Sequence, residues 1–107
     1  MSPAKQANDV TVAIAIELYE VISQLQRPRL RDPRWAASAR ARCHELSRRA
    51  LKQKASFAGR QATPPPALGA VADHLEAYAC ELDGKPSAVR LKAIYKPLTQ
   101  SYERLRV

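Results

Sequence analysis

Apolar residues recur every three or four positions along four stretches of this chain, and that spacing constrains the fold more than any other feature. In the first stretch they fall at Val10, Ile14, Leu18, Val21 and Leu25. A helical period of about 3.6 residues gathers such positions on one face, whereas a half-buried strand alternates at every second residue. The same spacing recurs in three later stretches, as far as Leu105. The sequence therefore predicts an all-α protein.

Prolines and glycines separate the four stretches and set the expected helix ends. Pro28 should stop the first helix near Gln26, and Asp32-Pro33 combines a capping carboxylate with a proline that suits the first helical turn. Gly59 is placed to end the second helix in a left-handed conformation. We expect a flexible segment over residues 1–8 and one helical domain over 9–107, with helices at about 9–26, 33–58, 66–83 and 87–105.

The first and fourth helices each raise a further expectation. Asn8 or Asp9 should cap the first helix, whose apolar face is broad enough to touch more than one neighbour. Pro97 lies within the fourth stretch and removes the hydrogen bond to the carbonyl of Ala93, so we expect a kink or a split there. Four amphipathic helices joined by short links favour an antiparallel four-helix bundle.

Length and composition restrict the class of protein further. The chain has 107 residues, enough for one hydrophobic core without metals or disulfides. The longest apolar run, Val12 to Ile16, is far shorter than the ~20 residues of a membrane span, and Glu17 follows it directly. We therefore expect neither a membrane helix nor a signal peptide. Cys43 and Cys80 are expected to be reduced, buried thiols of a cytoplasmic protein, although their helices could pack together and allow a disulfide.

Charge is divided unevenly among the segments. The chain carries 18 basic and 10 acidic residues, a net charge of +8. Residues 1–26 are net −2, residues 27–60 net +9, residues 61–84 net −4 and residues 85–107 net +5. Acidic and basic helices that lie side by side can pair some of these charges. Pairing cannot cancel the surplus, because the first and third segments carry too few carboxylates.

A helical wheel places most cations of the second helix opposite its apolar face, with Glu45 among them. With the preceding connector they would form a continuous basic strip that faces water, which is typical of a phosphate-binding surface. The residues expected to contact a nucleic-acid backbone are Arg27, Arg29, Arg31, Arg34, Arg42, Arg48, Arg49 and Lys52. A secondary patch on the fourth helix comprises Arg90, Lys92 and Lys96.

Residues suited to catalysis or metal binding are sparse. Cys43 and His44 are adjacent, so on a helix they point about 100° apart, and His74 and Cys80 are also poorly spaced for one metal. Only three residues separate Arg40 from His44, so the longer Arg–His spacing of HEPN-class helical ribonucleases is absent. The sequence also has no glycine-rich phosphate loop and no nucleophile–base pattern. We expect no enzymatic activity, no cofactor and no metal.

A helix-turn-helix is an alternative for residues 80–94. The turn Asp83-Gly84-Lys85-Pro86 suits that motif, but Arg90 falls near the position where a buried residue is required. The acidic preceding helix would also repel phosphates. A plain helical hairpin therefore fits this segment better.

The aromatic residues lie on the apolar stripes and not within the basic strip. They are expected to pack in the core with the tyrosine hydroxyls at its rim, so the sequence does not support stacking on bases. The residues concerned are Trp35, Tyr78, Tyr95 and Tyr102.

Taken together, these patterns predict a small, basic, non-enzymatic accessory subunit that binds the backbone of DNA or RNA without sequence specificity. In general character the chain is similar to the small helical subunits of CRISPR effector complexes. The alternative is a protein-interaction module, such as an adaptor, chaperone or inhibitor, that docks on an acidic partner or self-associates.

Overall fold

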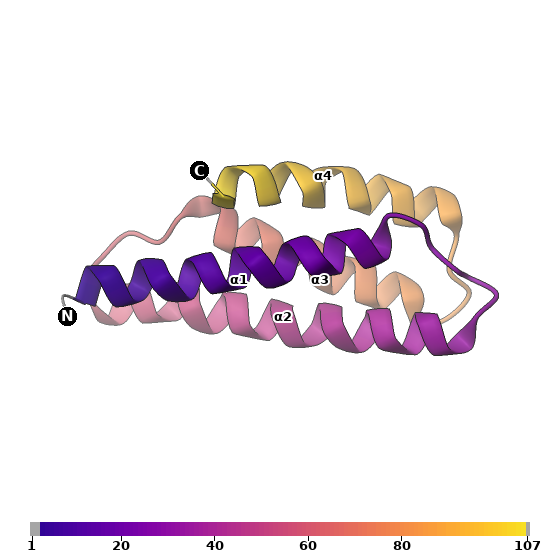
Figure 1. Ribbon diagram of the computed structural model, residues 1–107, viewed down its shortest axis with the longest axis horizontal. Coiled ribbons are helices and arrows are strands. Elements are labelled where there is room, and N and C mark those ends of the chain that lie inside the picture. The colour runs from indigo at the N-terminus through magenta and orange to yellow at the C-terminus, as the bar shows by residue number, and fades with distance from the viewer. Residues whose placement is uncertain (1–2, 107) are drawn as a thin grey trace.

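The computed structural model describes residues 3–106, which form an antiparallel four-helix bundle without strands (Figure 1). This architecture confirms the fold predicted from the apolar spacing. The bundle measures 47 × 21 × 19 Å. Its helices are α1 (Pro3–Leu25), α2 (Pro33–Gly59), α3 (Pro66–Leu82) and α4 (Ala88–Arg106).

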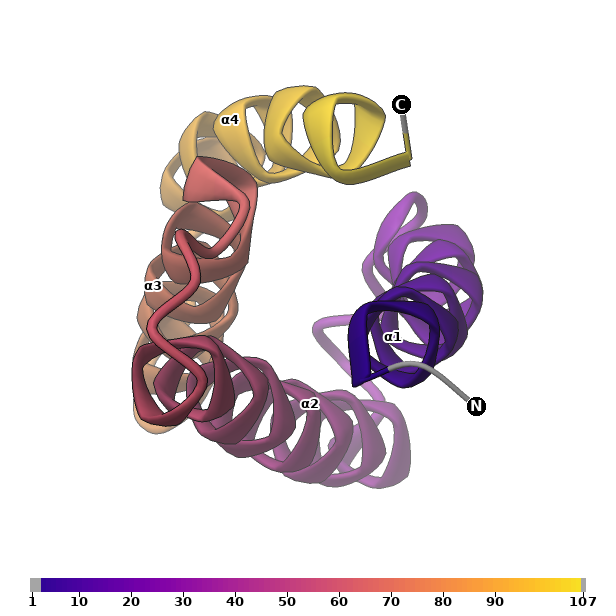
Figure 2. The same cartoon turned by 90° about the vertical axis from the view of Figure 1, so that its left-hand side faces the viewer.

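The four helices surround one core, but they do not close it equally (Figure 2). The contact between α2 and α3 is the most extensive, and the contact between α1 and α4 is the least extensive. We call this last contact the α1–α4 seam. The buried side chains of α3 include Leu68, Val71, Leu75 and Tyr78, which face the centre of the bundle. The bundle is most open along the α1–α4 seam (Figure 2).

The helices begin and end close to the expected residues, with one larger difference. The first helix starts at Pro3, so Asn8 and Asp9 lie inside it and not at its cap. Residues 3–8, expected to be flexible, are helical, and residues 1–2 lie outside the described part of the chain. Proline suits the first turn of a helix, and the residues that follow it include good helix formers, which together explain the earlier start.

Capping of α2 follows the prediction at its start and departs from it at its end. Asp32 accepts a hydrogen bond from the backbone N–H of Arg34 at 2.9 Å, which confirms the N-cap. At the other end Gly59 belongs to the helix, and the left-handed residue is Gln61, with φ of 56°. Gly59 therefore does not end the helix in a left-handed conformation, and the prediction for it was wrong.

Pro97 does not split the fourth helix, which is continuous from Ala88 to Arg106. Two nearby hydroxyls bond to carbonyls in the same region. Ser101 Oγ donates to the Pro97 carbonyl at 3.0 Å, and Thr99 Oγ1 donates to the Lys96 carbonyl at 2.7 Å. The α3–α4 pair is a helical hairpin whose helices lie side by side (Figure 1), as expected in place of a helix-turn-helix.

The two cysteines occupy different environments. Both are free thiols, so the possible disulfide does not form. Cys43 is buried in the core, as expected, whereas Cys80 is exposed. Cys80 is therefore not part of the core, and its Sγ lies 4.0 Å from a carboxylate oxygen of Glu76.

Candidate nucleic-acid interface

The connector between α1 and α2 holds its arginines outward. Leu30 packs against the core, while Arg27, Arg29 and Arg31 on either side of it are exposed. The backbone N–H of Asp32 donates to the carbonyl of Arg29 at 3.0 Å, which fixes the turn that leads into α2. One apolar side chain thus anchors the connector to the core, a backbone bond holds its own turn, and its cations are left in solvent.

Other cations lie at the same end of the molecule as this connector, among them Arg34 and Lys92. Arg34 is exposed in the first turn of α2, and Lys92 of α4 lines a cleft together with Pro28. The connector and the α3–α4 loop are both at this end (Figure 1). None of these cationic side chains has an ion-pair partner among residues 3–106. We call the group the basic end, which consists of Arg27, Arg29, Arg31, Arg34 and Lys92.

The continuous strip expected along α2 is interrupted, because two of its arginines turn toward α1. Arg42 Nη1 donates to Gln24 Oε1 at 2.8 Å, and its Nη2 lies 3.6 Å from a carboxylate oxygen of Glu20. Arg49 forms an ion pair with Glu17. These two arginines lie on the flank of α2 that faces α1. Because they contact acidic or polar side chains of α1, they do not belong to a continuous strip of free cations. Both side chains remain partly exposed, but their charge is partly neutralised by α1.

Arg48 and Lys52 form a separate pair on the outer face of α2. Both are exposed and have no ion-pair partner in the described part of the chain. They are one turn apart, but Arg48 is 14 residues beyond Arg34, or about 21 Å at 1.5 Å per residue. Arg48 and Lys52 therefore do not form one continuous surface with the basic end.

The secondary patch on α4 is also divided. Arg90 is exposed and lies 3.9 Å from a carboxylate oxygen of Glu81, whose side chain is mostly buried, so this cation is partly paired. Lys92 and Lys96 are exposed and unpaired within the described residues. Of the three expected residues, only Lys92 lines the cleft beside the connector.

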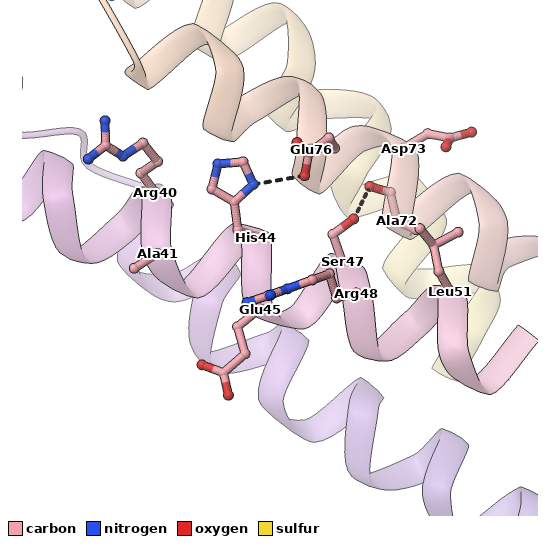
Figure 3. A pocket seen from close by; sticks show the side chains of 10 residues that line it. All are labelled: Arg40, Ala41, His44, Glu45, Ser47, Arg48, Leu51, Ala72, Asp73 and Glu76. Carbon is pink, nitrogen blue, oxygen red and sulfur yellow. Dashed lines mark hydrogen bonds and ion pairs between the residues drawn. The ribbon is translucent and has the colours of Figure 1, made fainter.

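A groove between α2 and α3 is lined by several polar side chains, two of which form contacts across it (Figure 3). His44 Nδ1 is 2.9 Å from Glu76 Oε2. Ser47 Oγ donates to the Ala72 carbonyl at 2.8 Å, and so does not bond to the histidine. These contacts join α2 to α3. Within residues 3–106 no group of three or more His, Cys, Asp or Glu side chains is placed to hold a metal ion.

A cleft at the basic end includes residues that the sequence assigned only to the core. It has a volume of about 360 Å³ and lies between the end of α1, α3 and the first half of α4. Tyr95 is half-buried in its wall and Tyr78 is fully buried behind it. The Tyr78 hydroxyl has no hydrogen-bond partner among the described residues, and burial raises the pKa of this tyrosine. Its hydroxyl was expected at the rim, and that prediction was wrong.

Part of the apolar face of α1 is exposed, although the sequence predicts that this broad face packs against more than one neighbour. Val12 is 56% exposed, and Ile16 and Tyr19 are each 59% exposed. The rings of Tyr19 and Tyr102 meet across the α1–α4 seam, with their centroids 6.1 Å apart. Even Val10, expected on the core stripe, is 45% exposed. The N-terminal turns of α1 extend beyond the end of α4 (Figure 1), so α4 does not cover them, whereas Gln53 of α2 donates to Thr11 Oγ1 at 3.3 Å.

Comparisons of this chain with protein-family models, curated proteins and solved structures find no match. No helix within residues 3–106 combines the length and apolar character needed to cross a membrane.

Proposed function

We propose that this protein is a non-enzymatic accessory subunit that binds the sugar–phosphate backbone of a nucleic acid through its basic end. The observation that supports this function is the presence of five exposed cationic side chains at one end of the bundle, none of them paired with a carboxylate in the described residues. Other arginines do pair with carboxylates, as Arg49 does with Glu17. Arg48 and Lys52 are also unpaired among the described residues, but they lie along α2 as a separate pair.

The chemistry of these side chains suits phosphate. Four of the five are arginines, whose planar guanidinium can donate two parallel hydrogen bonds to phosphate oxygens. The first turns of α2 and α4 are at the same end, where the helix dipoles add positive potential. Such binding depends on the release of counterions, so it should weaken steeply with salt and show little sequence preference.

The test is fluorescence anisotropy with a labelled random-sequence DNA strand and the matching RNA, at about 50 and 200 mM salt. The variant replaces Arg27, Arg29 and Arg31 with glutamine. A matched control also removes three charges but away from the basic end, at Arg48, Lys52 and Arg104. We expect the connector variant to lower the salt slope by about 2 on single strands. Absence of binding at low salt, or an equal loss in the control, contradicts the proposal.

A second candidate function, protein interaction by self-association, is favoured by the apolar face of α1. Val12, Ile16 and Tyr19 present an unbroken apolar surface of the kind that marks interaction sites. Three side chains fall well short of the roughly 800 Å² that each partner buries in a typical stable interface, which is why this candidate is second. Mass measured by light scattering over a range of concentrations tests it. A monomer at every concentration, unchanged by Ile16→Gln, contradicts it.

A further inference from the structure

We propose that the cleft at the basic end takes one unstacked base of a bound single strand, while the neighbouring cations hold the phosphates on either side of it. This inference rests on the proposed function and adds the kind of nucleic acid. It predicts a preference for single strands, because a paired base cannot leave the duplex without the loss of stacking and pairing.

The size and lining of the cleft suit a flat aromatic group. Its volume of about 360 Å³ lies within the range of small-ligand pockets, roughly 300–1,000 Å³. Leu25, Pro28 and Leu91 supply apolar walls, and the half-buried ring of Tyr95 offers an aromatic surface. Bases stack on such rings with little regard to sequence, since every base has a π face.

An unused hydrogen-bonding group lies behind the wall of the cleft. Tyr78 lines it with no exposed surface, and its hydroxyl is unpartnered among the described residues. A buried hydroxyl without a partner is unfavourable. The polar edge of a base could supply the missing hydrogen bond if α1 and α4 separated slightly at their seam, which is the least extensive helix contact in the bundle.

Charge is placed where a bound nucleotide would need it. Lys92 lines the same cleft as Pro28, and Arg27 and Arg29 flank that proline in the chain. A base inserted between Pro28 and Tyr95 would thus have cations on two sides of its phosphodiester link. The base site and the phosphate contacts adjoin each other, as single-strand binding requires.

The experiment compares a single-stranded oligothymidine with an abasic strand of equal length and charge. We expect the wild-type protein to bind the intact strand about tenfold or more tightly, and Tyr95→Leu to remove most of that difference. Tyr102→Leu is the matched control, because Tyr102 is also half-buried on α4 but lies at the other end of the seam, against Tyr19. Fluorescence of 2-aminopurine in the strand should be quenched by the wild-type protein and less so by Tyr95→Leu.

The outcomes separate this inference from the proposed function. Equal affinity for intact and abasic strands, with the connector variant still weakening both, overturns the base site and leaves backbone binding intact. Failure to bind either strand overturns both. The comparison of the two strands uses the wild-type protein, so it decides the matter even if Tyr95→Leu does not fold.

Discussion

Arg42 of α2 donates a hydrogen bond to the side-chain carbonyl of Gln24 of α1 at 2.8 Å. With the longer approach to Glu20, this contact joins two helices whose packing is limited compared with that of α2 and α3. Arg42 therefore contributes to the fold, whereas Arg48, only six residues later, has no such partner in the described chain.

Replacement of Arg42 by alanine should lower the free energy of unfolding by about 1 kcal/mol, the usual value of a partly exposed charge-assisted hydrogen bond. Arg48→Ala is the control and should change stability by less than about 0.5 kcal/mol. Urea denaturation followed by circular dichroism measures both. Equal effects would mean that the Arg42 contacts do not stabilise the α1–α2 packing.

Tyr78→Phe should raise the free energy of unfolding by about 1 kcal/mol, because it removes a buried hydroxyl that has no partner among the described residues. The aromatic ring keeps its packing against the core, so no cavity forms. The same denaturation experiment tests the change, with Tyr102→Phe as a half-buried comparison. A loss of stability in Tyr78→Phe would show that the hydroxyl is hydrogen-bonded in solution.

The two thiols should differ sharply in reactivity. Cys80 is exposed, whereas Cys43 is buried and its thiolate is disfavoured by desolvation. Maleimide labelling of the native protein should therefore modify one cysteine rapidly, and peptide mapping should identify it as Cys80. Modification of Cys43 should require the denaturant concentration that unfolds the bundle. Rapid double labelling of the native protein would contradict the packing of α2 in the core.

Stability should fall at alkaline pH. Burial raises the pKa of the Cys43 thiol to about 12, whereas an unfolded thiol ionises near pH 8.5. Between these values the unfolded state binds fewer protons, so the free energy of unfolding decreases as pH rises, by up to about 1.4 kcal/mol per pH unit. Cys43→Ala should show a shallower decline over the same range, although it is less stable at neutral pH. Parallel declines in the two proteins would exclude Cys43 as the cause.

Helical spacing and capping chemistry were sufficient to predict most of the fold. Apolar steps of three and four fix which residues share a face, and Asp32-Pro33 marks a helix start whatever the neighbouring helices do. The start of α1 at Pro3 escaped prediction because two capping signals, Asn8 and Asp9, compete with the proline. When several residues could each begin a helix, the local sequence does not show at which of them the helix begins.

The candidate site was less predictable because it depends on which helix lies beside which flank. A wheel places Arg42 and Arg49 away from the apolar stripe, but it does not show that acidic α1 covers that side. Likewise, the stripe of α4 assigns Tyr95 to the core, and only the open seam with α1 turns it toward a cleft. These contacts depend on how the helices pack against one another, so the residue spacing within a single helix does not predict them.

The position of Leu30 against the core has a consequence for any anion that meets the basic end. The backbone of a flexible arginine loop would become ordered on binding. The loss of conformational entropy would make the free energy of binding less favourable. Here the apolar anchor restricts the connector before any ligand arrives. The backbone that carries Arg29 and Arg31 is thus held in place before binding, and Leu30→Gly should weaken binding without the removal of a single charge.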